Sequence, residues 1–137
     1  MTSSRQTIVS DDLYTRKIEG QVLFPHAISV SGARYVWLAG QFAYSKSGQI
    51  VGHGDMRAQF RQTCENIRTA LHAADAKLED VVKVVFYVTD MDEYFRCFDL
   101  RHEYFGAAFP VSSTIEVSRL AVPGAMIEIE AVAAVTR

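Results

Sequence analysis

The sequence predicts an α+β domain in which two helices pack on one face of a mixed β-sheet. The first observation is the order of patterns along the 137 residues: strands, a helix, a strand, a second helix and two final strands. The second is the last strand, which alternates apolar residues with a mixed set of side chains, so that helices cover only one face. No repeat or linker divides the chain, and residues 1–137 are expected to form a single domain.

The first 40 residues carry three strand patterns. Weak alternation over residues 6–9 indicates a short strand within a polar lead-in. Residues 24–30 alternate and end at a Ser31-Gly32 turn. Residues 35–39 form a nearly continuous apolar run, which is typical of a central strand buried on both faces.

Two segments have helical periodicity. The first helix follows Asp55, a suitable N-cap, and its apolar stripe consists of Phe60, Cys64, Ile67, Leu71 and Ala74. The second helix is capped by Asp90 or Asp92 and ended by Gly106. Its stripe is predicted to contain Met91, Phe95, Phe98, His102 and Phe105.

Three strands remain, over residues 81–89, 112–120 and 126–135, with a Pro123-Gly124 turn between the last two. In the last strand, four apolar residues are expected to face the helices, namely Ile127, Ile129, Ala131 and Ala133. The opposite face carries Met126, Glu128, Glu130 and Val132. A sheet face that mixes carboxylates with apolar groups is often a subunit interface or a pocket wall.

Bulk properties exclude several classes of protein. A net charge of −2 without a basic run argues against nucleic acid as a partner. No apolar leader and no apolar stretch of about 20 residues is present, which favours a cytoplasmic protein without a membrane anchor. Cys64 and Cys97 lie in predicted helices without a CxxC spacing or a histidine pair, so we expect reduced thiols and no metal site.

Residues 109–120, followed by Ile127-Glu128-Ile129-Glu130, resemble the signature of the reactive intermediate deaminase family, also called the YjgF or RidA family. Ala39-Gly40-Gln41 and the segments 62–67 and 82–91 match in the same order. The resemblance implies a chorismate-mutase-like domain and a homotrimer with a cleft between adjacent subunits. It also implies hydrolysis of small enamine or imine acids without a cofactor.

Three site residues are carried over from the resemblance. Glu128 matches the glutamate that positions or activates the hydrolytic water, although it could equally be an exposed strand carboxylate. Gly40 matches a glycine whose carbonyl meets the substrate nitrogen. Thr114 matches a position whose backbone amide helps to hold the substrate carboxylate.

Three departures from the family pattern bear on the substrate. Ser112 occupies the slot of the arginine that grips the substrate carboxylate, and serves either as a polar contact or as filler. His26 stands where many members have tyrosine, either as a partner acid/base or as a structural histidine at the trimer seam. Phe98 replaces a site asparagine and is either a pocket wall or core.

The missing cation has three candidate replacements, Arg34, Arg101 and Arg119, each of which is interpreted first as a solvated surface charge. The favoured hypothesis is a hydrolase or tautomerase for a conjugated amino or imino intermediate other than 2-aminoacrylate, with a larger or less acidic substrate. The alternative is a non-catalytic trimer that binds a small metabolite, or a partner subunit of a pathway enzyme. Release of ammonia from an imine separates the two.

Overall fold

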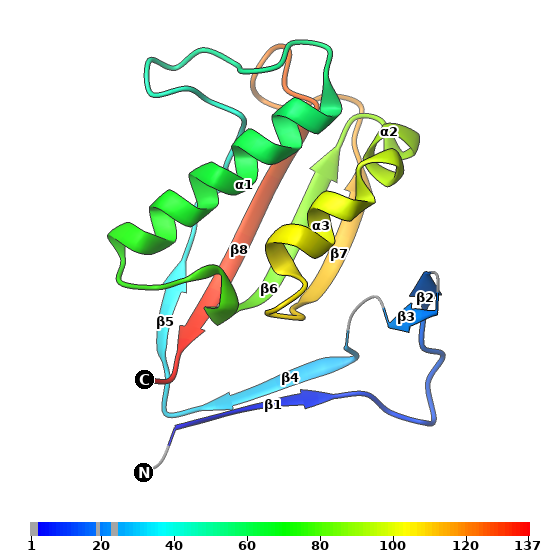
Figure 1. The fold of residues 1–137 in the computed structure, drawn as a ribbon, viewed down its shortest axis with the longest axis vertical. Coiled ribbons are helices and arrows are strands. Elements are labelled where there is room, and N and C mark those ends of the chain that lie inside the picture. The colour runs from blue at the N-terminus through cyan, green and yellow to red at the C-terminus, as the bar shows by residue number, and fades with distance from the viewer. Residues whose placement is uncertain (1–2, 19, 23–24) are drawn as a thin grey trace.

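A four-stranded mixed sheet forms the centre of the molecule in this computed structural model, which describes residues 3–18, 20–22 and 25–137 (Figure 1). Its order is β5 (Arg34–Trp37), β8 (Ile127–Val135), β6 (Val81–Val88) and β7 (Val111–Glu116). β8 pairs antiparallel with both neighbours, and β6 pairs parallel with β7. The two final strands are therefore not a hairpin, because β6 lies between them.

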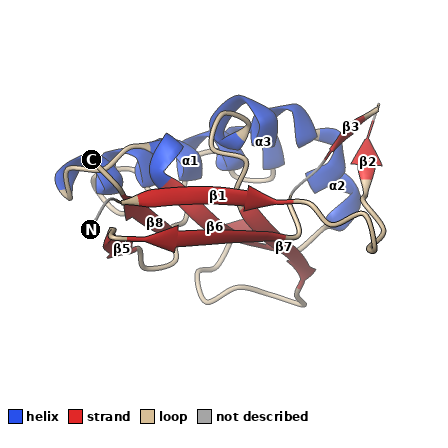
Figure 2. Ribbon diagram, turned by 90° about the horizontal axis from the view of Figure 1, so that it is seen from below, coloured by secondary structure: helices blue, strands red, loops and turns tan. Residues whose placement is uncertain are grey.

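Helices cover one face of this sheet (Figure 2). They are α1 (Met56–Ala73), α2 (Met91–Arg96) and α3 (Phe98–Phe105), with a 3₁₀ turn, η1 (Leu78–Asp80), before β6. The expected α+β architecture is confirmed, with one difference. The predicted second helix is divided at Cys97, which ends α2 and begins α3.

The N-terminal part forms a separate layer below the sheet in Figure 1. β1 (Ser4–Ile8) pairs antiparallel with β4 (Ala27–Ser31), and β2 (Lys17–Ile18) pairs with β3 (Gln21–Val22). The strand predicted over 24–30 begins at Ala27, and position 24 lies outside the described residues.

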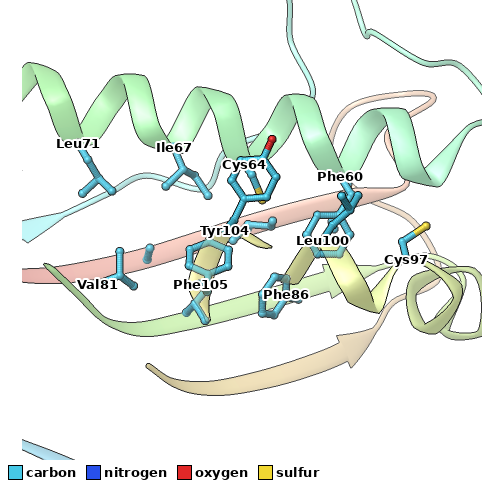
Figure 3. Close-up of a cluster of buried hydrophobic side chains, with 14 of the residues drawn as sticks. Phe60, Cys64, Ile67, Leu71, Val81, Phe86, Cys97, Leu100, Tyr104 and Phe105 are labelled. Carbon is cyan, nitrogen blue, oxygen red and sulfur yellow. The ribbon is translucent and has the colours of Figure 1, made fainter. Parts of the chain in front are cut away.

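The first helix forms as its sequence predicts. The Asp55 carboxylate accepts a hydrogen bond from the Ala58 amide at 3.1 Å and caps the free N–H groups of the first turn. Four residues of the predicted stripe are fully buried against the sheet (Figure 3), namely Phe60, Cys64, Ile67 and Leu71. Ala74 is only half-buried, because it is the C-cap rather than a helical residue.

The predicted stripe of the second helix is wrong in part, although Met91 and Phe98 do pack against the core. His102 is exposed and Phe95 is partly exposed, whereas the buried positions include Tyr94, Cys97, Leu100 and Tyr104. The buried stripe keeps the helical repeat through Tyr94, Cys97, Arg101 and Tyr104, one residue earlier at each turn than the predicted stripe. Phe105 is buried as predicted and meets Phe86 edge to face at 5.9 Å.

The prediction of a central strand over residues 35–39 is also wrong. β5 is an edge strand, and the side chains of Tyr35 and Trp37 are 49% and 76% exposed. A continuous apolar run does not distinguish a strand buried within one chain from an edge strand whose exposed face packs on another molecule. By contrast, β8 alternates as predicted, since Ile127, Ile129, Ala131 and Ala133 are buried beneath the helices.

Two smaller boundaries differ. β7 ends at Glu116 rather than at residue 120. β6 has a bulge, because Val81 pairs with Ala133 and Lys83 with Val132, which leaves Val82 unpaired. The bulge turns Val81 into the core, although alternation from the buried Val84 and Phe86 would place it on the opposite face.

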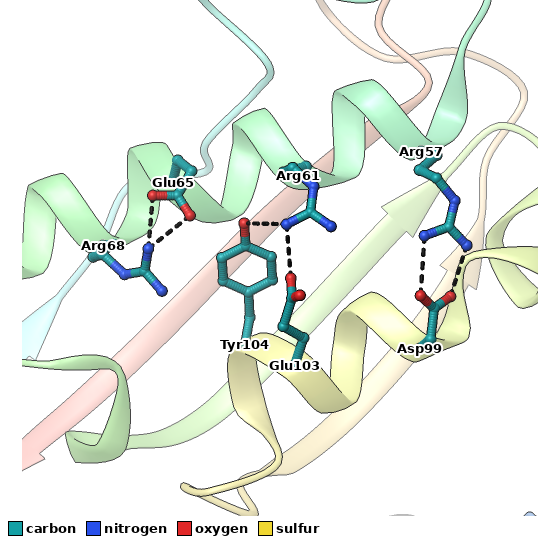
Figure 4. A network of polar contacts seen from close by, with 7 residues as sticks. All are labelled: Arg57, Arg61, Glu65, Arg68, Asp99, Glu103 and Tyr104. Carbon is teal, nitrogen blue, oxygen red and sulfur yellow. Dashed lines mark hydrogen bonds and ion pairs between the residues drawn. The ribbon is translucent and has the colours of Figure 1, made fainter.

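Polar contacts also join α1 to α3 (Figure 4). The Arg57 guanidinium forms a two-pronged ion pair with Asp99, and Arg61 contacts Glu103 and the Tyr104 hydroxyl. Both ion pairs are about half-exposed, so each contributes little to stability by itself. Their effect is to fix how the two helices lie side by side.

Gln59 is a buried polar residue that holds two loops against α1. Its amide nitrogen donates to the carbonyls of Gly52 and Gly124, and its amide oxygen accepts from the Met126 N–H. This side chain therefore fixes the loop that leads into β8.

We expect Gln59→Ala to lower the free energy of unfolding by about 2 kcal/mol or more, because it leaves three main-chain groups without their partner. Gln62→Ala is the matched control on the same helix and should cost less than about 1 kcal/mol, since Gln62 is only partly buried and makes one side-chain hydrogen bond, to Asn66. Urea unfolding of both variants measures the difference. Equal losses would contradict the structural role given to Gln59.

Candidate functional site

The outer edge of β7 and the adjoining helices enclose a pocket of about 280 Å³. Its lining residues are Arg16, Met91, Tyr94, Phe95, Phe98, Arg101 and the strand residues 112–114. Three of the positions singled out from the sequence, Phe98, Ser112 and Thr114, therefore lie together. The lining set contains two arginines and no carboxylate.

Arg101 contributes one positive charge to this pocket, and its interpretation as a solvated surface charge is wrong. Its side chain is not solvated at the surface, since the residue is only 7% exposed. The guanidinium donates to the Ser112 hydroxyl at 2.6 Å and lies 5.7 Å from the ring centre of Phe98. Burial lowers the pKa of Arg101, yet an arginine remains charged at neutral pH.

A sequence signal for this burial exists. Positions 94, 97, 101 and 104 follow the helical repeat, so Arg101 shares a face with Tyr94, Cys97 and Tyr104. The other two candidate cations lie elsewhere. Arg34 donates to the carbonyls of Ala74 and Asp75 at the end of α1, and Arg119 is exposed.

Arg16 is a second pocket cation that the sequence did not indicate. It belongs to the N-terminal lead-in, and its guanidinium lies 5.8 Å from the ring centre of Phe95. Phe95 in turn stacks on Phe98 at 6.0 Å. Positive charge and aromatic rings thus meet along one wall.

The main chain of β7 presents donors at the same edge. The N–H of Val117 bonds the Val88 carbonyl on β6, so by strand alternation the N–H groups of Ser112 and Thr114 point away from β6. None of the described strands pairs with that outer edge. The amide of Thr114 is therefore directed outward, as its expected contact requires.

Tyr94 lines the inner end of the pocket. Its hydroxyl is buried and has no partner at hydrogen-bonding geometry among the described residues. Burial raises the pKa of Tyr94, and the neighbouring Thr114 hydroxyl opposes that rise.

Glu128 and Gly40, two other expected site residues, are brought into contact on the open face of the sheet. Main-chain bonds from Leu38 to Ala131 and from Gln41 to Ile129 extend the pairing of β5 along β8 and place Gly40 beside Glu128. A Cβ at Gly40 would lie 2.0 Å from Oε1 of Glu128, so any side chain at this position would displace the carboxylate from where it lies.

The carboxyl group of Glu128 is electrostatically perturbed. Burial, and secondly the charge of Glu130, raise the pKa of Glu128 above its ordinary value. Glu130 accepts a hydrogen bond of 2.8 Å from the Tyr87 hydroxyl on β6. A carboxylate with a raised pKa suits proton transfer near neutral pH.

Within one chain, Glu128 and the pocket are separated. Glu128 pairs with Tyr87, and Tyr87 with Ile115, so Glu128 lies two strand spacings from β7, roughly 10 Å. Ser112 bonds α3 on the helix side, whereas Glu128 lies on the open face. A single copy therefore divides the expected site residues into two groups.

His26 belongs to neither group. Its Nδ1 accepts a hydrogen bond from the Ser10 amide at 2.8 Å, and its Nε2 lies 3.0 Å from the Tyr14 carbonyl, to which it therefore donates. Both ring nitrogens thus hold the lead-in loop against the start of β4. None of the hydrogen bonds among the described residues joins His26 to Glu128.

No group of three or more His, Cys, Asp or Glu side chains suited to a metal ion occurs among the described residues. Within the same ranges, every helix is too short or too polar to cross a bilayer.

The raised pKa of Glu128 has a consequence for stability. Because the folded protein binds this proton more tightly than the unfolded chain does, the free energy of unfolding falls as the pH rises from about 4.3 through the folded-state pKa. Glu128→Gln cannot ionise, so we expect it to gain stability relative to the wild type over this window. Melting temperatures at pH 4 and pH 7 test this, and an equal difference at both values would contradict it.

Comparison with known proteins gives a consistent result. The family model described as endoribonuclease L-PSP matches residues 17–135. RutC family protein PH0854 of Pyrococcus horikoshii is 39% identical over 110 residues, which are 80% of this chain and 86% of that protein. The 2-iminobutanoate/2-iminopropanoate deaminase of Escherichia coli K12 is 32% identical over 116 residues, with 80% and 86% covered. The crystal structure of YyfB from Yersinia pestis, a Rid family protein of unknown function, has a TM-score of 0.80 at 32% identity, covering 94% of this chain and 97% of that one.

Proposed function

Because the chain belongs to the endoribonuclease L-PSP family, the YjgF/RidA family, we propose that it hydrolyses a conjugated imine or enamine acid other than 2-aminoacrylate to a keto acid and ammonia. The family includes proteins named as imine deaminases, which supports a deaminase-like role. The observation that carries the proposal is the Glu128 carboxyl group packed against Gly40 with its pKa raised.

Glu128 is the proposed base. In hydrolysis of the protonated imine, its carboxylate takes a proton from water while the water oxygen bonds the C=N carbon and the π electrons move to nitrogen, giving a neutral carbinolamine. The protonated Glu128 then gives this proton to the nitrogen. As the C–N bond breaks and ammonia leaves, the carboxylate takes the hydroxyl proton and the C=O bond forms. An enamine first takes a proton at its β-carbon to become the imine. None of these reaction steps uses a cofactor.

Gly40 and β7 are the proposed positioning elements. None of the hydrogen bonds among the described residues uses the Gly40 carbonyl, which is therefore suited to accept from the substrate nitrogen. The outward amide of Thr114 and the Ser112 hydroxyl, which already contacts Arg101, would orient the acid end. Phe98 forms the apolar wall.

A second copy of the chain would bring together these two groups, which lie apart within one chain. We propose a homotrimer in which the Glu128 side of one subunit faces the β7 edge of its neighbour. The open face is suited to burial, because a groove of about 450 Å³ there is lined by Tyr35, Trp37 and Val132 together with β4. His26 lies on the same N-terminal layer and is proposed as an acid/base partner from this seam, provided that its loop contacts are exchanged.

We expect Glu128→Gln to slow ammonia release at least about 100-fold, because general acid–base groups contribute roughly 10²–10⁴. The substrates are imines formed in situ by an L-amino-acid oxidase, assayed with and without the protein. Glu65→Gln, an exposed carboxylate on α1, is the control and should keep full activity. Acceleration that survives in Glu128→Gln would reject this base. Ligand binding without any acceleration in the wild type would favour the non-catalytic binding trimer.

The oligomer is tested independently. We expect Trp37→Asp to convert the trimer into a monomer, because it places a charge on the most exposed aromatic residue of the open face. Thr69→Asp on the outer side of α1 is the control and should remain trimeric. Multi-angle light scattering gives the mass, and a monomeric wild type would remove the shared site.

A further inference from the structure

We infer that Arg101 takes over the grip on the substrate carboxylate from helix α3, and that the rings of Phe95 and Phe98 receive an aromatic or extended unsaturated group on the same substrate. The substrate class is therefore an aromatic α-imino acid rather than a small or less acidic one. This inference rests on the proposed function and names the substrate of the same site.

The carboxylate grip, which is the first part of the inference, rests on the position of the Arg101 charge. The Arg101 guanidinium extends from α3 and donates to the Ser112 hydroxyl at 2.6 Å. Its positive charge therefore lies beside the strand position whose own side chain, serine, is neutral. The same strand edge directs the Thr114 amide outward. A carboxylate at this edge would therefore meet a cation and a main-chain donor together.

The aromatic group on the substrate, which is the second part of the inference, rests on the side chains of the pocket wall. Phe95 and Phe98 stack on each other at 6.0 Å, and Met91 joins them in the pocket lining. A carboxylate alone would leave this apolar wall in contact with water. A planar apolar substituent would cover the rings and gain from its own burial.

Size is consistent with this substrate class. The pocket of about 280 Å³ is close to the lower end of small-molecule sites, about 300–1,000 Å³. It is larger than the methyl or ethyl group of a small imino acid needs. Arg16 beside Phe95 adds a second positive charge at the same wall, which further favours an anion over a neutral amine-derived imine.

Equilibrium binding tests the inference without turnover. The probes are phenylpyruvate, pyruvate, and phenylacetone, which replaces the carboxylate of phenylpyruvate with a methyl group. By calorimetry, we expect the wild-type trimer to bind phenylpyruvate at least about tenfold more tightly than either other probe. Equal affinity for phenylpyruvate and phenylacetone would overturn the carboxylate grip. Equal affinity for phenylpyruvate and pyruvate would overturn the aromatic wall.

Two variants assign these effects to residues. Arg101→Gln should weaken phenylpyruvate at least about 30-fold and leave phenylacetone within about twofold, as expected for the loss of a buried charge contact. Phe98→Ala should weaken phenylpyruvate and leave pyruvate unchanged. Arg68→Gln, an exposed arginine of α1, is the control and should change neither. Wild-type phenylpyruvate affinity in a folded Arg101→Gln trimer would overturn the assignment.

Arg101 is buried, so a conservative variant guards against loss of the fold. Arg101→Lys retains the charge but not the planar fork, and should bind phenylpyruvate about tenfold more weakly than the wild type with phenylacetone unchanged. Wild-type phenylpyruvate affinity in Arg101→Lys would also count against the inference. The two proposals fail separately: tight, Arg101-dependent binding without ammonia release rejects only the hydrolase, and Glu128-dependent ammonia release with Arg101-independent binding rejects only the clamp.

Discussion

The structure depends on the one-sided covering of a twisted mixed sheet. All three helices lie on one face, and β8 divides its side chains accordingly, with Ile127, Ile129 and Ala133 buried under the helices. Glu128 and Glu130 consequently fall on the other face, where no helix covers them. The same alternation that builds the core thus places the perturbed carboxyl group on a surface that only another molecule can enclose.

The sequence predicted those parts of the fold that follow from a simple repeat. The strict alternation of β8 and the Asp55 cap with its buried stripe each depend on local chemistry, and both were confirmed. The errors occurred where one pattern fits two arrangements. In the second helical segment the buried stripe lies one residue earlier than the predicted stripe, and the apolar β5 is an edge strand.

For the site, residue matching selected positions that the fold brings together in pairs, Glu128 with Gly40 and Ser112 with Phe98. It did not find the buried position of Arg101, because a charged residue in a helix is normally solvated. The helical repeat through positions 94, 97, 101 and 104 does place Arg101 on the buried side, but the apolar residues Phe95 and Phe98 favour the neighbouring stripe. Nor could local spacing show that His26 bonds the lead-in loop through both ring nitrogens.

The position of a ligand-binding arginine depends on different contacts when it lies on a helix and when it lies on a strand. A strand residue inherits its position from the rigid ladder of main-chain bonds. Arg101 instead inherits its position from the way α3 rests against α1, which the pairs Arg57–Asp99 and Arg61–Glu103 help to set (Figure 4). Asp99 and Glu103 flank Arg101 on α3 but do not line the pocket, so replacing these exposed ion pairs would remove contacts that set the position of Arg101 without changing the pocket wall.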